Sequence, residues 1–369
     1  MKIFILALVF SFITCINCIS RITDSHLNNG ASFIFGDSLV DAGNNNYLRT
    51  LARGNIRPYS IDFKPSGGNP TGRYTNGKTI ADITGELMGQ KHYAVPFLAP
   101  NTTGKALIHG VNFASGGGGI LRDTGRVFIN RLSMDVQIDC FNITRQRIAS
   151  LLGPERARNY IMTKSIFSVT LGSNDFLNNY LLPIFSVGVR RALTPEAFIE
   201  DLITHMRGQL TRLYNLDARK FIVANVGPIG CIPYEKAMNR VTDSECAELP
   251  NNMALQYGAR LKDLLQELKQ NLPEATFVYA NVYDLVLGLI RNYEQYGFTS
   301  VDTPCCGGGQ YSGLSPCGPT SILCADHTKH FFWDAYHPSE AANKIISKQL
   351  LHGDPKYVTP MTLQALRDL

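Results

Sequence analysis

Short apolar segments alternate with longer amphipathic ones along most of this chain, and this alternation constrains the fold more than any other feature. Each short segment is rich in β-branched or aromatic residues and nearly free of charge, as buried parallel strands are. The five predicted strands are Ser32–Phe35, Ile108–Phe113, Ser165–Leu171, Lys220–Asn225 and Thr276–Ala280. Since parallel strands need crossover helices, the pattern predicts a three-layer α/β domain with a parallel sheet.

Apolar residues at helical spacing mark three of the intervening segments. One stripe runs from Phe198 to Leu213, a second from Met253 to Leu268, and a third helix is predicted from Pro338 through Leu350. Thr194 and Pro195 suit the N-cap and the first helical position of the first of these helices. The chain has no internal repeat and no low-complexity linker, and α/β enzymes of this length often form a single domain.

Residues 1–20 are predicted to be a secretory signal peptide that does not belong to the fold. Lys2 precedes an apolar run from Ile3 to Phe10, and Cys18 lies near a plausible cleavage point. Polar residues from Ser11 onward interrupt this run too early for a membrane anchor, which needs about 20 apolar residues. No later stretch is long enough to span a bilayer, so we expect a secreted protein without an integral membrane segment, found in the apoplast or cell wall if the source is a plant.

The charge distribution argues against a nucleic-acid partner. The net charge is +5, and the lysines and arginines are scattered without any long basic run. A nucleic-acid-binding protein usually concentrates its positive charge in a patch or stripe. A solvated surface explains these charges better, and nothing in the sequence decides the oligomeric state.

The cysteine count and two sequons fit an oxidising compartment. Seven cysteines remain after the signal peptide, and in such a compartment we expect most of them in disulfides, with at least one left over because the number is odd. They are Cys140, Cys231, Cys246, Cys305, Cys306, Cys317 and Cys324. Asn101 and Asn142 begin Asn-x-Thr sequons and are candidate glycosylation sites.

Ser38 directly follows the first predicted strand, at the rim of the sheet where open α/β folds bind their ligands. A serine at this place can act as a nucleophile if a base takes its proton. The segment is not the Gly-x-Ser-x-Gly elbow of α/β-hydrolases, because Val40 occupies the place of the second glycine. Taken alone, a serine after a strand is usually a helix cap.

A candidate base lies near the other end of the chain. Asp334 and His337 are three residues apart, which puts them on one side of a helical turn. The aspartate could accept the Nδ1–H of the imidazole and leave Nε2 to face the serine. A competing pair, Asp326 with His327 or His330, is less favoured because it lies among cysteines and lacks a following helix.

Two further strand ends carry groups that can bind an anion. Four glycines end the segment Asn112–Gly119, and their exposed backbone N–H groups could bind a phosphate or an oxyanion. The run is not Gly-x-Gly-x-x-Gly, since Leu121 and Arg122 stand where a final glycine is needed. In Gly172–Asp175, the amide of Asn174 could donate to the same oxyanion, or the segment could cap a helix.

Together these segments resemble the GDSL esterase/lipase family of secreted plant hydrolases, within the SGNH hydrolase superfamily. The resemblance rests on six motifs in family order and covers nearly the whole mature chain. They are Phe35–Asn45, Pro70–Gly77, Val111–Gly117, Gly172–Asp175, Gly230–Pro233 and Phe332–Pro338. One departure is Gly118, where the plant family often has alanine. The resemblance assigns residues 27–352 to one hydrolase domain, followed by a C-terminal tail over residues 353–369.

The resemblance implies a flavodoxin-like three-layer α/β/α sandwich with a five-stranded parallel sheet. It implies Ser38 as nucleophile, His337 as base and Asp334 as the partner of the base. It further implies an oxyanion hole formed by the Ser38 backbone, Gly116 and Asn174, with no cofactor and no metal. The cysteines from Cys305 onward match the disulfide region of the family. We therefore expect a serine hydrolase that cleaves lipid or other acyl esters.

Three alternatives are weighed against this prediction. A zinc site could use the late cysteines with His327 and His330, although the spacing is irregular and the compartment oxidising. The protein could be an acyltransferase that moves an acyl group to a sugar or hydroxy-acid acceptor. It could also be a secreted binding protein without catalysis, but the intact set of predicted catalytic residues argues against this.

Overall fold

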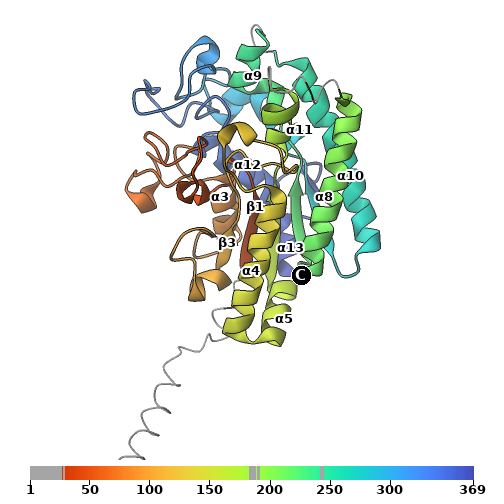
Figure 1. Ribbon diagram of the computed structural model, residues 1–369. Coiled ribbons are helices and arrows are strands. Elements are labelled where there is room, and N and C mark those ends of the chain that lie inside the picture. The colour runs from red at the N-terminus through yellow and green to blue at the C-terminus, as the bar shows by residue number, and fades with distance from the viewer. Residues whose placement is uncertain (1–26, 28–29, 183–187, 189–191, 242–244) are drawn as a thin grey trace, which may run out of the picture.

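The computed structural model describes residues 27, 30–182, 188, 192–241 and 245–369, so the predicted signal peptide lies outside the described residues. Among these residues the chain forms one seven-stranded sheet in the order β2-β3-β1-β4-β5-β6-β7. Figure 1 shows the helices packed around the strands of this sheet. The strands are β1 (Ala31–Gly36), β2 (Val95–Pro96), β3 (Gly110–Asn112), β4 (Ser165–Thr170), β5 (Lys220–Ala224), β6 (Thr276–Ala280) and β7 (Val358–Thr359).

The five predicted strands form the centre of this sheet, and all of them are parallel. The α/β fold with a parallel sheet is therefore confirmed, but the predicted number of five strands is wrong. The two additional strands are edge strands of two residues each, β2 paired parallel to β3 and β7 paired antiparallel to β6. Two residues are too few to carry a hydrophobic period, so the neighbouring strand determines their conformation.

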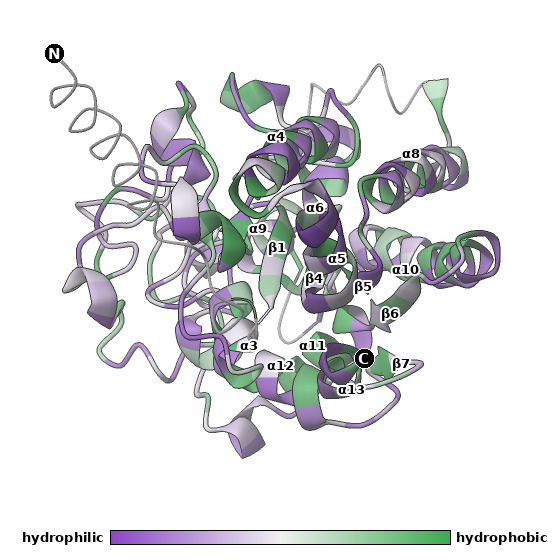
Figure 2. Cartoon of the chain, turned by 90° about the horizontal axis from the view of Figure 1, so that it is seen from below, coloured by the Kyte–Doolittle hydropathy of each residue, from purple (hydrophilic) through white to green (hydrophobic). Residues whose placement is uncertain are grey.

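Helices cover both faces of the sheet. Figure 2 shows α4, α8 and α10 on one side of the strands and α3, α11, α12 and α13 on the other. The α-helices are α3 (Ile80–Leu87), α4 (Met134–Leu152), α5 (Pro154–Lys164), α6 (Ser173–Asp175), α8 (Pro195–Asn215), α9 (Pro233–Met238), α10 (Glu248–Asn271), α11 (Val282–Arg291), α12 (Glu340–His352) and α13 (Leu363–Asp368). This arrangement is the predicted three-layer sandwich.

The two faces of the sheet carry side chains of very different size. On the α4 side, Phe33, Phe167, Phe221 and Phe277 form a continuous row across four strands, with ring centroids 5.2, 5.8 and 4.6 Å apart. Since side chains alternate along a strand, the residues between these phenylalanines point to the other face. That face presents mainly Ser, Thr, Ala, Gly and Ile, which fill much less volume.

Capping explains where two predicted helices begin. The Thr194 hydroxyl accepts a hydrogen bond from the Ala197 N–H, so the predicted N-cap of α8 is confirmed. For α12 the predicted start was two residues early, because Ser339 caps the helix through the Ala342 N–H and Pro338 precedes the cap. A Ser N-cap satisfies an otherwise unpaired N–H group, which determines the start of the helix.

The segment after His352 packs against the domain. Its strand β7 extends the sheet, and Asn281 N–H donates to the Tyr357 carbonyl at 2.8 Å. Leu363 and Leu366 of α13 are both fully buried in the main hydrophobic core. The C-terminal segment therefore contributes both main-chain pairing and apolar contacts to the region that covers β6.

Six of the seven predicted mature cysteines are paired. The disulfides are Cys231–Cys246, Cys305–Cys324 and Cys306–Cys317. Cys140 is free and buried in α4, which confirms that the odd count leaves one cysteine over. The four late cysteines are disulfide-bonded to one another, so in this structure they have no thiolates to offer to a zinc ion.

Neither a membrane-spanning helix nor a metal-binding cluster is found among the described residues. None of the helices in this part of the chain combines the length and the apolar character that crossing a bilayer requires. Within the same residues, no cluster of three or more His, Cys, Asp or Glu side chains has a geometry that could hold a metal ion.

Replacing Leu366 by alanine should destabilise the protein by about 2–5 kcal/mol, because the side chain is fully buried and the cavity left behind cannot collapse completely. Chemical denaturation measures this change. Leu369, at the end of the same segment, is 66% exposed and provides the control, with an expected change within about 0.5 kcal/mol for Leu369→Ala. Equal stability of the two variants would contradict a structural role for α13.

Candidate active site

Three loops meet at the carboxyl edge of the sheet, because β1 pairs in parallel with β3 on one side and with β4 on the other. Ser38 follows β1, Gly116 follows β3, and Asn174 follows β4. Ligands of open α/β sheets bind at this edge. The fold thus brings together three of the segments that the sequence marked separately.

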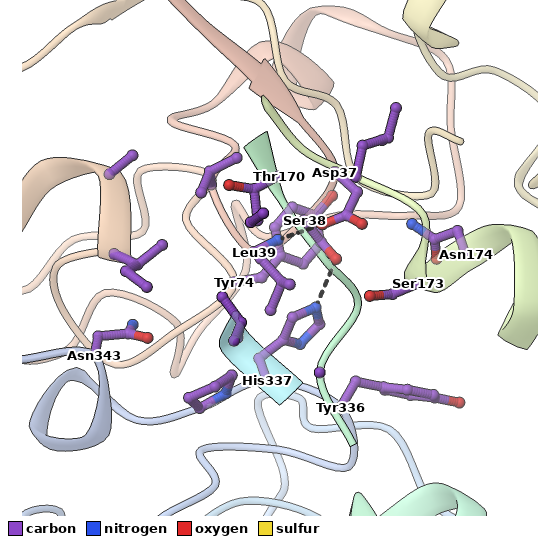
Figure 3. A pocket seen from close by; sticks show the side chains of 18 of the residues that line it. Asp37, Ser38, Leu39, Tyr74, Thr170, Ser173, Asn174, Tyr336, His337 and Asn343 are labelled. Atoms are coloured by element: carbon purple, nitrogen blue, oxygen red, sulfur yellow. Dashed lines mark hydrogen bonds between the residues drawn. The ribbon is translucent and has the colours of Figure 1, made fainter. Parts of the chain in front are cut away.

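The loop before α12 joins this edge from the far end of the chain. His337 Nε2 lies 2.7 Å from Ser38 Oγ, and this hydrogen bond connects residues 299 positions apart (Figure 3). On the other side of the ring, His337 Nδ1 lies 2.8 Å from both carboxylate oxygens of Asp334. The three side chains therefore form one continuous hydrogen-bonded chain.

A tight loop, and not a helical turn, holds Asp334 and His337 together. Asp334 Oδ1 accepts hydrogen bonds from the Tyr336 and His337 N–H groups at 2.8 and 2.7 Å. The Trp333 N–H donates to the His337 carbonyl at 2.8 Å and closes the loop. The predicted helical spacing is thus wrong in its geometry, although the three-residue separation still brings the two side chains into contact.

The environment of Asp334 favours its charged form. Burial alone would raise the pKa of this carboxyl, but the charge of His337 and hydrogen bonds from His337, Tyr59 and the Tyr336 N–H hold it below its ordinary value. The Tyr59 hydroxyl donates to Asp334 Oδ2 at 2.6 Å. An ionised Asp334 that is held on several sides can orient the imidazole and stabilise its protonated form.

The three predicted oxyanion donors differ in their availability. The Ser38 N–H has no acceptor among the described residues. Asn174 donates one amide hydrogen to the Gly118 carbonyl at 2.9 Å and accepts from Asn178 at 2.6 Å, which fixes its orientation and leaves its second N–H available. The Gly116 N–H donates to Asp41 Oδ2 at 3.1 Å, so in this structure it is already engaged.

The amides of the glycine-rich loop bind carboxylates of the protein itself. Besides Gly116, the Ile120 and Leu121 N–H groups donate to Asp175 at 2.8 and 3.0 Å. Asp41 also accepts from the Gly43 N–H at 2.7 Å. Of the glycine N–H groups predicted to bind a phosphate or oxyanion, that of Gly116 is therefore occupied by an internal aspartate, and Asp175 binds the two N–H groups that directly follow the glycines.

Three buried aspartates lie in the loops that follow β1 and β4, and burial is the largest cause of their raised pKa values. It raises the pKa of Asp37 to about 7 and the pKa values of Asp41 and Asp175 to about 6, against hydrogen bonds that lower them. Asp37 Oδ1 accepts the Leu39 N–H at 3.0 Å, whereas its Oδ2 has no hydrogen-bond partner among the described residues. Asp37 is therefore the carboxyl of this site that most readily carries a proton near neutral pH.

A cavity of about 540 Å³ opens beside Ser38 and His337. Figure 3 shows Ser38, Asn174 and Tyr336 around it, with Ser38 and His337 facing each other. Its mouth combines apolar side chains with the charged Arg53, and Leu51 on the rim is 68% exposed. The volume lies within the range of about 300–1,000 Å³ that is typical of small-molecule sites.

The competing acid–histidine pair is not assembled. His327 Nδ1 lies 2.7 Å from Asp62 Oδ2, and His330 Nδ1 contacts the Thr303 carbonyl at 2.8 Å, so neither ring bonds to Asp326. None of these residues lines the cavity beside Ser38. The structure thus brings Asp334 and His337, and not this pair, to the serine.

Sequence reasoning missed several residues that support the site. Tyr59 contacts Asp334 from a position 275 residues away, and no local signal in the sequence indicates this bond. Asp41 and Asn45 lie in the first recognised motif but received no role. Asn45 Nδ2 donates to the Gly116 carbonyl at 2.9 Å, and Ser115 Oγ donates to Asn45 Oδ1 at 2.5 Å. The sequence signal that could have identified Asp41 and Asn45 is the high density of Asp and Asn residues directly after the first strand.

Comparison with known proteins gives a consistent result. The sequence profile of the GDSL-like lipase/acylhydrolase family matches residues 33–350. The chain is 63% identical over 341 residues to GDSL esterase/lipase At2g23540 of Arabidopsis thaliana, covering 92% of this chain and 88% of that protein. It is 61% identical to GDSL esterase/lipase At3g50400 and 48% identical to GDSL esterase/lipase At4g16230 of the same plant, in each case over 92% of this chain and 91% of the relative.

Replacing Asp37 by asparagine should weaken the pH dependence of stability. The folded protein holds the Asp37 proton up to about pH 7, whereas the unfolded chain releases it near the ordinary pKa of 3.8. The stabilisation is therefore present below about pH 4 and is lost as the pH rises towards 7. In Asp37→Asn, the fall in Tm between these pH values should be smaller than in the wild type. Identical slopes would show that this carboxyl is ionised in the folded protein across the range.

Proposed function

Because this chain belongs to the GDSL-like lipase/acylhydrolase family and is an esterase or lipase, we propose that it hydrolyses carboxylic esters through Ser38, His337 and Asp334. The observation that carries the proposal is the chain of hydrogen bonds from Ser38 Oγ through the imidazole to the Asp334 carboxylate. This arrangement is the one that activates a serine hydroxyl in other hydrolases.

In the first half of the reaction, His337 Nε2 accepts the proton of Ser38 as Oγ attacks the ester carbonyl carbon. The negative charge of Asp334 stabilises the imidazolium that forms. The tetrahedral intermediate then collapses, the bond from the acyl carbon to the alcohol oxygen breaks, and His337 returns its proton to the leaving alcohol. The product of this half-reaction is an acyl-enzyme on Ser38.

In the second half, water takes the place of the alcohol. His337 removes a proton from the water as its oxygen attacks the acyl carbon, and then returns the proton to Ser38 Oγ. The acid is released and the starting state is restored. An acceptor hydroxyl in place of water would convert the hydrolase into an acyltransferase, so product analysis with an added alcohol distinguishes the two reactions.

The negative charge on the carbonyl oxygen needs donors that are oriented before the reaction. We assign this role to the Ser38 N–H and the free N–H of the Asn174 amide. The predicted third donor, the Gly116 N–H, can contribute only if its bond to Asp41 is given up. Asn178 orients Asn174 through its hydrogen bond to Oδ1, so we propose that it acts as a positioning residue.

Secretion is part of the proposal. Three disulfides and the apolar segment over residues 3–10 support an oxidising destination. Of the two sequons, Asn101 is exposed in a turn and suits glycosylation. Asn142 lies within α4 and is partly buried, and the Thr144 hydroxyl is buried against the Cys140 carbonyl, so we expect little modification there.

Ser38→Ala should abolish hydrolysis of a chromogenic short-chain ester, with a loss of several orders of magnitude in kcat because the nucleophile is removed. Labelling by a fluorophosphonate probe should disappear in the same variant. Ser150→Ala, an exposed serine on α4, is the matched control and should keep both properties. If Ser38→Ala retained the wild-type rate, the protein would not use this serine.

Asn174→Ala should lower kcat by about 10²–10³-fold while leaving the fold intact, because one oxyanion donor is lost. Steady-state kinetics and circular dichroism test the two parts of this statement. Asn252→Ala, on the exposed surface of α10, should behave like the wild type. A change confined to KM would indicate that Asn174 binds the substrate in its ground state and does not stabilise the transition state.

A further inference from the structure

The cavity beside Ser38 continues into the interior of the domain. It extends between the small-residue face of the sheet and the helices α3, α11, α12 and α13. Leu39 and Asn343 line it where it leaves Ser38. Its inner lining includes Ile34, Ala81, Thr84, Met88, Ser168 and Ile222.

The sheet itself creates this space. On the inner face, Ile34, Ser168 and Ile222 stand next to one another across β1, β4 and β5. Ser168 lies in the middle of a central strand, yet its side chain is partly accessible, whereas its neighbours Phe167 and Val169 on the opposite face are buried. A serine at this position leaves the volume that a large side chain would fill in an ordinary core.

The helix α3, which lines the cavity opposite the sheet, also presents mostly small side chains to it. The cavity is lined by five residues of α3 and its C-cap, namely Ile80, Ala81, Thr84, Gly85 and Met88. The last four share one helical face by their spacing. The helix starts beside the active site, since Thr79 and Ser38 border the same small pocket. Beyond its end, Gln90 bonds to Ser32 near the start of β1. The helix α3 therefore follows the cavity along its length.

The inner cavity and its mouth differ in charge. The acidic and basic lining residues Asp37, Arg53, Asp334 and His337 all lie at the mouth or the active site. None of the inner lining residues carries a charge. The inner hydroxyls of Ser32 and Thr84 already bond to Gln90 and Ser347. An uncharged ligand with few polar groups suits this space, because apolar cavities do not hold water firmly.

We propose that this inner cavity binds the acyl chain of the ester while the alcohol group stays in the mouth. The inference rests on the proposed function, because it requires the ester carbonyl at Ser38. From the level of Gly36 to that of Ser32 the cavity follows β1 for about 13 Å at about 3.3 Å per residue. A linear chain suits a space that extends this far along one strand better than a compact or branched acyl group does.

Two residues at different depths should determine the accepted chain length. Ala81 lies in the first turn of α3, close to Ser38, and Met88 lies at its C-terminal end. A larger side chain at Ala81 blocks the chain early, whereas a smaller one at Met88 extends the far end. The two substitutions therefore change chain-length preference in opposite directions, which general damage to the fold would not do.

The experiment measures kcat/KM for acetyl, butyryl, decanoyl and palmitoyl esters of one chromogenic alcohol. The ratio of the decanoyl to the butyryl value should fall at least about tenfold in Ala81→Leu. The ratio of the palmitoyl to the decanoyl value should rise several-fold in Met88→Ala. The control Ala197→Leu, at an exposed position in α8 on the other side of the sheet, should keep both wild-type ratios. Folded Ala81→Leu and Met88→Ala variants with unchanged ratios would overturn the proposal.

A binding measurement separates this inference from the proposed function. Isothermal titration calorimetry of the Ser38→Ala protein should detect binding of decanoate but not of acetate, and the additional substitution Ser168→Leu should weaken decanoate binding at least about tenfold. Absence of decanoate binding would overturn the acyl site even if the wild type hydrolyses acetyl esters. Conversely, decanoate binding by a protein that hydrolyses no ester would support the acyl site but refute the proposed function.

Discussion

The parallel pairing of β1 with both β3 and β4 is the constraint on which the candidate site depends. Three strands that run in the same direction end at the same edge, so the residues directly after them emerge side by side. The register of the main-chain hydrogen bonds sets the height of each loop, and a slip of one residue would turn every side chain to the other face. Ser38 and Asn174 share one pocket because of this pairing.

Buried carboxylates then connect the loops at this edge. Asp41 joins the loop after β1 to the loop after β3, and Asp175 joins the loop after β4 to the same glycine-rich segment. Each carboxylate oxygen accepts N–H groups that would otherwise be buried without a partner. Burial raises the pKa of both carboxyl groups, because it disfavours their charged forms. The hydrogen bonds to these groups hold the loops in a single arrangement.

Much of the architecture could be predicted because its signals are local. The five central strands each carry their own apolar pattern, and the stripe after Thr194 carries its own cap, so both were correctly predicted. The two edge strands have no such signal, since β6 and β3 supply the pairing that keeps them extended. The loop from Asp334 to His337 was misread as a helical turn because an aspartate that bonds backbone N–H groups imitates helical spacing.

The sequence by itself determined the fold class, the order of the elements and the residue types at each strand end, because strand and helix preferences act over a few neighbouring residues. Only the tertiary structure decided which of these groups meet. It set the bond from Tyr59 to Asp334, the capture of the Gly116 N–H by Asp41, and the cavity under the small-residue face. These features depend on distances between atoms that are dozens to hundreds of residues apart, and such distances exist only once the whole chain is packed.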